Sequence, residues 1–295
     1  ETRIVDAPDA PLADGGVRLA IESFSVTANN VTYAVIGDMF GYWNFFPTGE
    51  EDWGVVPMWG HAHVAESRHP DIAVGERVYG YLPMATHLDV LPGKVGDAGF
   101  TDMADHRQPM SPFYNQYSRL AADPEHDPAR EDARMIFGPL FKTGFLIEAF
   151  MRRNDWFGAN QCVLTSASSK TAMALAHCIR QSSPGVKRIG LTSPGNIAFV
   201  EKTGLYDVVL PYGDDLGLPQ ADSVSVDFAG NAGVLCAIHV GLGNHLRYSC
   251  TVGMTHVGAR GGAGGTLPGP TPTLFFAPDH AVAIANHDER GEAEA

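Results

Sequence analysis

The segment 161-QCVLTSASSKTAMALA-176 holds the densest group of side chains that could do chemistry. A short apolar run ends there in a polar turn, and a helical pattern begins directly after it. At a helix start the backbone amides point outward and the helix dipole favours an anion. The side chains that add donors are Ser166, Ser168, Ser169, Lys170 and Thr171. We therefore predict that this turn contacts a nucleotide pyrophosphate; a hydroxyl-capped helix without a ligand is the alternative.

Two sharper motifs are excluded at this turn. A phosphate loop of the GxxxxGK[ST] type needs glycines where Leu164 and Ser169 stand, and a Ser-x-x-Lys nucleophile needs serine at Ala167. The glycines of a dinucleotide-binding turn are replaced by Ser168 and Ser169. Small Ala172, in contrast, allows the helix to pack closely on the strand.

The next strand bears on the choice of cofactor. It ends in Thr192 and Ser193, and Asn196 follows three residues later. A site for NAD normally has Asp or Glu at this strand end, where the carboxylate binds the ribose hydroxyls. Hydroxyl and amide groups accept a 2′-phosphate more readily than a carboxylate does. If a dinucleotide binds, the sequence favours NADP, with these residues near the adenosine ribose.

The secondary-structure elements that position the turn can be predicted from residue patterns, which differ between the two halves of the chain. Residues 1–125 contain short alternating segments with Gly and Pro between them, which favours a β-rich domain. Residues 121–134 are polar and contain proline, which indicates a linker or an exposed loop. Residues 138–156 have helical spacing, and strand and helix patterns then alternate. This alternation predicts an α/β fold with a parallel sheet and helices on both faces.

Further candidate ligand groups follow two later strands. Asp227 and Asn231 come at one predicted strand end, and Gly253, Thr255 and His256 follow the next. Ligands bind at the carboxyl ends of strands in open α/β sheets. Either a cofactor contact or a loop-capping role fits these residues.

Composition narrows the classes of partner. The net charge of −14 repels nucleic-acid backbones and anionic membranes, and no apolar run is long enough to span a bilayer. Cys162, Cys178, Cys236 and Cys250 suit neither a zinc clip nor a disulfide framework, and no signal-peptide pattern is visible. We expect a cytoplasmic protein with reduced cysteines and a small-molecule substrate; a homodimer stays open.

Several segments resemble the medium-chain dehydrogenase/reductase superfamily, within it the zinc-free quinone-reductase-like branch. They are 29-NNVTYAVIG-37, 74-VGERV-78, 161-QCVLTSASSKTAMALA-176 and 199-FVEKTGLYDVVLPY-212. The strings FGYWNFFP, GPLFKTGFLI and FFAP resemble a bacterial and fungal subgroup of unknown function. The resemblance implies a GroES-like domain over residues 1–130, a Rossmann-type nucleotide-binding domain over 131–285 and a charged tail over 286–295, with a cleft between the domains.

The resemblance also implies roles for residues of that cleft. Tyr33 would orient or protonate the oxygen of a quinone, enone or other carbonyl compound reduced by NADPH. The remaining residues of the substrate pocket would be Asn30, Tyr42, Trp43, Phe46 and Phe276.

Two other readings stay open. The lost glycines motivate a non-redox lyase of the retro-aldol or hydration type, with Lys170, Tyr33 or His256 as acid or base, or a ligand-binding protein without catalysis. The zinc ligands of the alcohol-dehydrogenase branch are missing, since Ala62 follows His61 where that branch has Glu. His61 and His63 could pair on one strand face, but no third ligand is evident, so we expect no metal.

Overall fold

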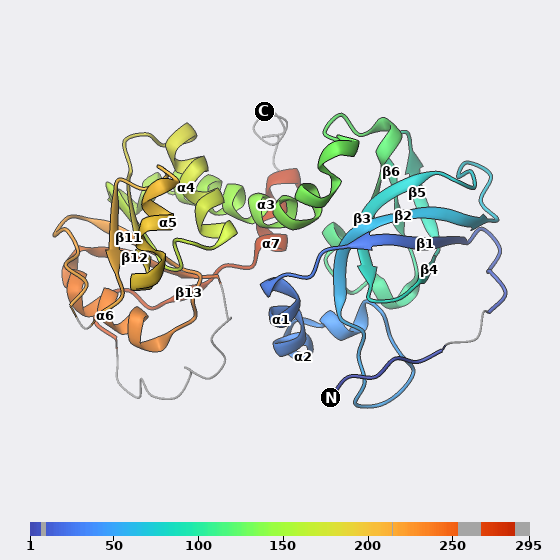
Figure 1. The fold of residues 1–295 in the computed structure, drawn as a ribbon, viewed down its shortest axis with the longest axis horizontal. Helices are drawn as coiled ribbons and strands as arrows, with labels where there is room; N and C mark the ends of the chain where they lie inside the picture. The colour runs from blue at the N-terminus through green and yellow to red at the C-terminus, as the bar shows by residue number, and fades with distance from the viewer. Residues whose placement is uncertain (7–9, 214, 253–266, 287–295) are drawn as a thin grey trace. The chain divides into compact units, whose positions relative to one another are not determined.

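The computed structural model describes residues 1–6, 10–213, 215–252 and 267–286. It divides the chain into two compact units, Glu1–Met135 and Ile136–Ala295, and Figure 1 shows the course of the chain through both. Each unit has its own sheet, antiparallel in the first and parallel in the second. The predicted order, a β-rich half followed by a parallel α/β half, is confirmed.

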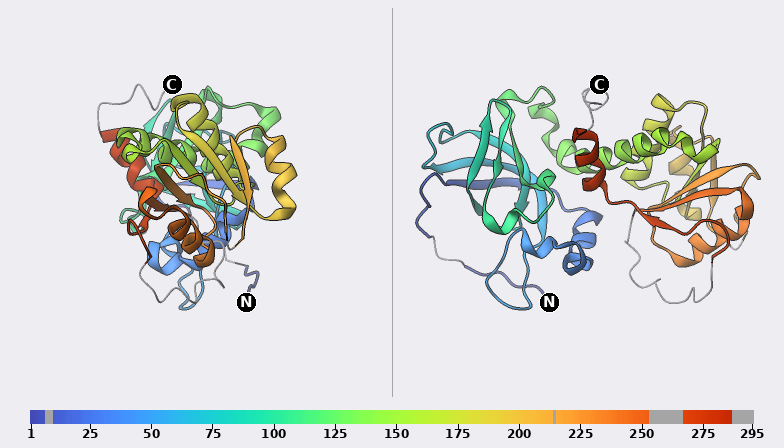
Figure 2. Two further views of the ribbon diagram at one scale, coloured as in Figure 1. Left: turned by 90° about the vertical axis from the view of Figure 1, so that its left-hand side faces the viewer. Right: turned by 180° about the vertical axis from the view of Figure 1, so that it is seen from behind.

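Figure 2 shows the curled sheet of the first unit. Its seven strands pair in the order β4-β1-β2-β3-β7-β6-β5. Its strands are β1 (Val17–Phe24), β2 (Pro57–Ser67), β3 (Arg77–Pro83), β4 (His87–Val90), β5 (Pro92–Gly96), β6 (Gly99–Asp102) and β7 (Gln116–Arg119).

Alternation along β2 and β3 separates two kinds of side chain. Ala62 and Leu82 point into the apolar core of the curled sheet. Trp59, His61 and Tyr81 alternate with them and share the opposite face. Because successive side chains of a strand point to opposite faces, one register fixes both groups.

Two helices interrupt the β-rich unit where the sequence predicted only strands and turns. They are α1 (Ala28–Val35) and α2 (Gly37–Phe40). The Thr27 hydroxyl accepts the Asn29 amide, and the Asn30 side chain accepts the Thr27 amide. This reciprocal cap satisfies amides that a helix start leaves without partners, so the short helix α1 can form.

Residues 121–130 of the polar segment 121–134 form the exposed loop that its composition predicted, and only residues 131–134 are helical. A 3-10 turn, η5 (Pro128–Arg130), leads directly into the long helix α3 (Glu131–Arg153). Arg134 of this helix pairs with Asp123. This ion pair helps to fix the start of α3.

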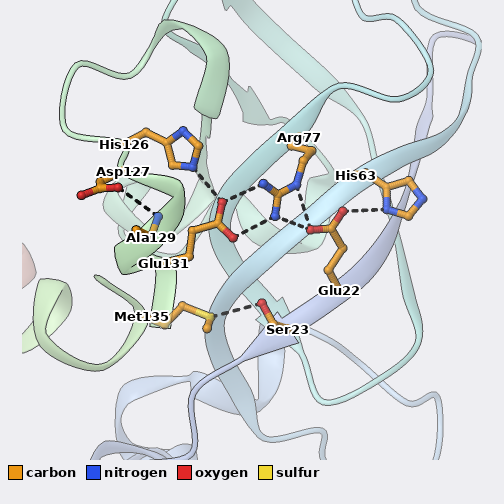
Figure 3. Close-up of polar contacts among 9 residues, drawn as sticks. All are labelled: Glu22, Ser23, His63, Arg77, His126, Asp127, Ala129, Glu131 and Met135. Carbon is orange, nitrogen blue, oxygen red and sulfur yellow. Dashed lines mark hydrogen bonds and ion pairs between the residues drawn. The ribbon is translucent and has the colours of Figure 1, made fainter. Parts of the chain in front are cut away.

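Glu131 is the centre of this ion-pair network (Figure 3). Its carboxylate accepts from Arg77 of β3 at 2.7 Å and contacts the imidazole Nε2 of His126 at 2.7 Å. Arg77 also donates to Glu22 of β1 at 2.6 Å, and His63 contacts Glu22 at 3.0 Å. The network ties β1, β2 and β3 to the first turn of α3.

Acid is expected to weaken this connection. The hydrogen bond from Arg77 lowers the pKa of Glu131 to about 2, and His126, His61 and the charge of Arg77 act in the same direction. A carboxylate with a depressed folded-state pKa stabilises the protein above its unfolded pKa, and that contribution is lost as pH falls through about 2. Because Arg77 is partly exposed, solvent screening limits the contribution to about 1–3 kcal/mol.

The measurement is denaturant unfolding of the wild type and of Glu131→Gln between pH 7 and pH 2. The stability difference should be largest near neutrality and shrink as the pH falls below about 4.5, the ordinary range of a glutamate. Exposed Glu125 lies in the same segment, and Glu125→Gln is the control. A Glu131→Gln difference that stays constant over this range would contradict the assignment.

The second unit contains a parallel sheet of six strands in the order β10-β9-β8-β11-β12-β13. Its strands are β8 (Gln161–Leu164), β9 (Lys187–Thr192), β10 (Val208–Pro211), β11 (Ser223–Asp227), β12 (Leu246–Thr251) and β13 (Thr273–Leu274). Its helices besides α3 are α4 (Lys170–Ser182), α5 (Ile197–Lys202), α6 (Ala232–Leu242) and α7 (Ala277–Asn286).

Both faces of this sheet are covered, as a parallel sheet requires. On one face Leu164 packs in a core with Leu175 of α4 and Ile147 of α3. On the other face Val163 packs with Ile238 of α6. The adjacent residues Val163 and Leu164 thus belong to different cores, which explains the continuous apolar run that ends at the turn.

Candidate functional site

The turn between β8 and α4 has a backbone conformation that glycine usually adopts, although a serine stands there. Ser166 has φ 48°, in the left-handed region that favours glycine. A serine there costs about 1 kcal/mol. Ser169 is the N-cap of α4, and its hydroxyl accepts the Ala172 amide at 3.3 Å. Ala172 is fully buried, as its predicted packing role requires.

Two tyrosines beside β10 hold the turn in place. The Ser166 amide donates to the Tyr212 hydroxyl at 2.6 Å, and the Tyr206 hydroxyl donates to the Ala167 carbonyl at 2.8 Å. A Cβ at Gly190 would lie 2.8 Å from the Tyr206 ring, so this glycine lets the ring approach. Side-chain hydrogen bonds therefore fix a conformation that glycines would otherwise allow.

The turn is also joined to the loop after β9. The side-chain amide of Asn196 donates to the Ser168 hydroxyl oxygen at 3.2 Å. Ser193 and Asn196 are exposed, whereas Thr192 is 1% exposed. Asn196 and Ser168, assigned from the sequence to different parts of one nucleotide, thus lie in contact, while the Thr192 side chain is enclosed in the unit.

Exposure at the start of α4 leaves side-chain donors accessible. Ser168, Ser169 and Thr171 are half-buried, and Lys170 is exposed. The hydroxyls of Ser168 and Ser169 accept hydrogen bonds from within the protein, so their protons can still be donated outward. This end of the second unit can therefore offer hydroxyl donors and one cation to an anion.

Asp227 and Asn231 have the loop-capping contacts that the sequence left open as an alternative. The buried Asp227 carboxylate accepts from the Thr165 hydroxyl at 2.6 Å and from the Ala229 amide at 3.0 Å. Asn231 is the N-cap of α6 and accepts the Gly233 amide at 2.9 Å. Gly253, Thr255 and His256 lie outside the described residues.

A second candidate group lies in the first unit around Tyr33. This tyrosine belongs to α1 and is 7% exposed. Its ring centroid is 4.6 Å from that of Tyr42, whose hydroxyl lies 3.3 Å from the hydroxyl of Tyr114. Phe46 joins the group through the ring of Tyr81, 6.1 Å away. Three of the predicted pocket residues, Tyr33, Tyr42 and Phe46, are therefore gathered in one aromatic cluster.

The other predicted pocket residues have different positions. Asn30 donates to the Pro57 carbonyl at 2.9 Å, so its side chain holds α1 on β2. The Trp43 indole lies against two glycines, and a Cβ on Gly37 would come within 2.2 Å of it. Phe276 belongs to the second unit, just before α7.

Sequence reasoning missed four residues that shape these two groups. They are Trp59, Tyr81, Tyr206 and Tyr212. Strand alternation places Trp59 on the face of His61, which was a usable signal. The position of Tyr81 could be predicted only from the β2–β3 register. The positions of Tyr206 and Tyr212 could be predicted only from the pairing of β10 with β9, which brings them to the turn.

Burial controls the protonation of the aromatic cluster. Removal from water raises the pKa values of Tyr33, Tyr42, Tyr81 and Tyr114. All four are neutral phenols at physiological pH, so the cluster is a set of O–H donors and acceptors. Burial likewise lowers the pKa of His61.

Within the described ranges, no group of three or more His, Cys, Asp or Glu side chains is placed to hold a metal ion. No helix among these residues is both long and apolar enough to cross a bilayer. The four cysteines are free thiols, and Cys236 is the least buried of them.

Comparison with known proteins places the chain in a family. The family described as "Protein of unknown function (DUF2855)" matches residues 24–295. The chain belongs to this family. No curated protein matches the sequence of this DUF2855 member.

Solved structures match nearly the whole chain. CurA from Vibrio vulnificus is 13% identical, with a TM-score of 0.53 over 98% of this chain and 82% of that one. The same protein in complex with NADPH is 14% identical, with a TM-score of 0.50 over 97% and 83%. A putative NADPH:quinone reductase from Mesorhizobium loti is 12% identical, with a TM-score of 0.54 over 97% and 76%.

At these identities the likeness is one of fold. The DUF2855 chain shares the architecture of these structures, a GroES-like β-rich unit and a Rossmann-type sheet, and the predicted fold class is confirmed. Membership of the medium-chain dehydrogenase/reductase superfamily stays a prediction. The quinone-reductase-like branch and the subgroup stay predictions.

Proposed function

We propose that this protein is an NADP-dependent reductase of a quinone, enone or other carbonyl compound. The observation that carries the proposal is the turn between β8 and α4. It stands at the carboxyl end of a Rossmann-type sheet, where ligands bind. Its half-buried and exposed side chains can donate hydrogen bonds to an anion. The fold is shared with CurA, solved in complex with NADPH, and with a putative NADPH:quinone reductase.

The residues of the turn fit a dinucleotide in chemistry. Ser168, Ser169, Thr171 and the Lys170 ammonium would bind the pyrophosphate, and Ser193 with Asn196 would lie by the ribose phosphate. Tyr206 and Tyr212 hold the turn before any ligand arrives, so little ordering accompanies binding. NADPH, when bound, supplies a hydride to an electron-poor carbon of the substrate.

Tyr33 would supply the proton that completes this reduction. Burial raises the pKa of its phenol, so at neutral pH the group is protonated and can only donate. The same burial disfavours the phenolate that donation leaves behind, so proton transfer needs groups that stabilise the negative oxygen. The aromatic side chains around it would suit a flat, conjugated substrate with one oxygen to protonate. These assignments give the two candidate groups distinct tasks, one for the cofactor and one for the substrate.

Titration of the purified protein with NADPH and NADH tests the proposal. We expect NADPH to bind more tightly, because no carboxylate stands at the end of β9. Lys170→Ala should weaken NADPH binding by about tenfold, the value of one charge-assisted contact. Lys187→Ala is the matched control, since this exposed lysine lies at the opposite end of the sheet, as the first residue of β9.

Each contrary outcome points elsewhere. A preference for NADH would contradict the reading of Thr192, Ser193 and Asn196. Indifference to both nucleotides at millimolar concentration would remove the reductase and favour the lyase or the ligand-binding protein. Equal binding by wild type and Lys170→Ala would show that the turn only caps a helix.

A further inference from the structure

Two buried polar atoms beside Tyr33 have no hydrogen-bond partner. They are the indole Nε1 of Trp59 in β2 and the hydroxyl oxygen of Tyr81 in β3, and neither forms a hydrogen bond to any described residue. A buried donor left without a partner costs about 1–3 kcal/mol. Two such groups in one cluster call for a physical explanation.

Both groups belong to the aromatic cluster that contains Tyr33. The Tyr81 ring stands edge-on to the Tyr33 ring, at 5.7 Å and 88°, and the Trp59 ring lies 5.1 Å from that of Tyr81. Neither contact reaches hydrogen-bond geometry in the neutral cluster. Both groups nevertheless lower the pKa of the Tyr33 phenol, against the larger effect of burial and the repulsion from Tyr42 and Tyr79, which raise it.

The chemistry of the two groups explains why they favour the ionised form of Tyr33. An indole N–H can only donate a hydrogen bond, and a Tyr81 phenol with a strongly raised pKa keeps its proton. Both therefore interact more strongly with a negative oxygen than with a neutral hydroxyl. Donors already in place where charge will develop, and weakly engaged before it does, are typical of catalytic sites.

We propose that Trp59 and Tyr81 are positioning residues that donate hydrogen bonds to the Tyr33 oxygen as that oxygen becomes negative. The inference rests on the proposed function and deepens it, because it explains how a buried phenol can serve as the acid. The Tyr33 O–H bond breaks, its proton forms a new bond to the substrate oxygen, and the electron pair stays on the phenolate. The phenolate later takes a proton from water.

The first test needs neither cofactor nor substrate. A fluorinated tyrosine, whose phenol ionises closer to neutrality, is placed at position 33, and its ionisation is followed by ¹⁹F NMR. Trp59→Phe and Tyr81→Phe keep an aromatic ring and remove one donor each. Each should raise the ionisation midpoint by about one pH unit, a tenfold change in the equilibrium. Two variants are used so that one remains if the other does not fold.

Tyr79→Phe is the matched control. Tyr79 stacks on Trp59 at 5.7 Å in the same sheet, but its hydroxyl does not act as a donor to Tyr33. Its removal should leave the midpoint unchanged or lower it. An ionisation midpoint that does not change in either Trp59→Phe or Tyr81→Phe would overturn the proposal. So would a midpoint that rises by the same amount in Tyr79→Phe.

The second test follows turnover of a quinone or enone with NADPH. Trp59→Phe should lower kcat by about tenfold while the KM for the substrate changes little, since the lost interaction forms only as charge develops. Tyr33→Phe should lower kcat further, and adding Trp59→Phe to it should have no additional effect. A shifted ¹⁹F midpoint in a protein without reductase activity would keep the Tyr33 assignment and refute the proposed function. An additive loss in the double variant would refute the positioning role.

Discussion

Replacement of Arg107 by methionine is expected to destabilise the first unit by about 3–5 kcal/mol. Arg107 is completely buried, and its guanidinium pairs with the buried carboxylate of Asp102 at 3.2 Å. It also donates to the Tyr117 hydroxyl at 2.9 Å and the Tyr114 carbonyl at 2.7 Å. Methionine fills much of the same volume, but it leaves the Asp102 charge without its partner.

Denaturant unfolding of the variants measures this effect. Arg68→Met is the matched control, because Arg68 is 46% exposed and pairs at 3.3 Å with a fully exposed Asp14. Exposed pairs of this kind are worth about 0–1 kcal/mol. The double variant Arg107→Met with Asp102→Asn should recover part of the loss. Similar losses for Arg107→Met and Arg68→Met would show that the buried pair contributes little.

Substitution of Gly144 by alanine should destabilise the second unit by about 1–3 kcal/mol, the usual cost of an overpacked contact. Gly144 lies in α3 where this helix crosses α4. A Cβ there would be 2.7 Å from the backbone nitrogen of Leu175 and 2.9 Å from the Cβ of Ala174. Because a backbone atom cannot turn aside as a side chain can, the two helices must separate.

A second helical glycine supplies the control. A Cβ on Gly241 of α6 would approach no atom closer than 3.7 Å, an ordinary contact. Alanine is favoured over glycine in helices by about 1 kcal/mol, so Gly241→Ala should be neutral or stabilising in thermal unfolding. If Gly144→Ala proves as stable as Gly241→Ala, the close crossing of α3 and α4 is not a determinant of stability.

Local patterns were enough to predict the second unit. An apolar run, a polar turn and a helical stripe follow one another within residues 161–176, so the period changes within a short distance. The helices of the first unit were harder to predict from the sequence. Helix α1 has only eight residues, and Asn30 completes its cap where Glu or Gln is the usual signal.

The candidate site was predicted only where one segment supplies it. The predicted donors around Lys170 are neighbours in sequence and lie together at the start of α4, and their role stays a prediction. Trp59 and Tyr81 meet through the β2–β3 register, with Trp59 opposite Tyr81, and no local pattern specifies that pairing. The exposed loop was predicted correctly over residues 121–130, but composition alone did not show that α3 already begins at Glu131, because an ion-paired helix start and a solvated loop have the same composition.

The hydroxyl of Tyr212 affects how a turn of this shape can be recognised in a sequence. It accepts the Ser166 amide from a position 46 residues further along the chain. A search for a glycine fingerprint inspects only the turn itself, so it passes over a loop whose shape is set from the neighbouring strand. A turn of this shape would be recognised better by pairing a serine-rich segment with a tyrosine that follows β10 than by counting glycines.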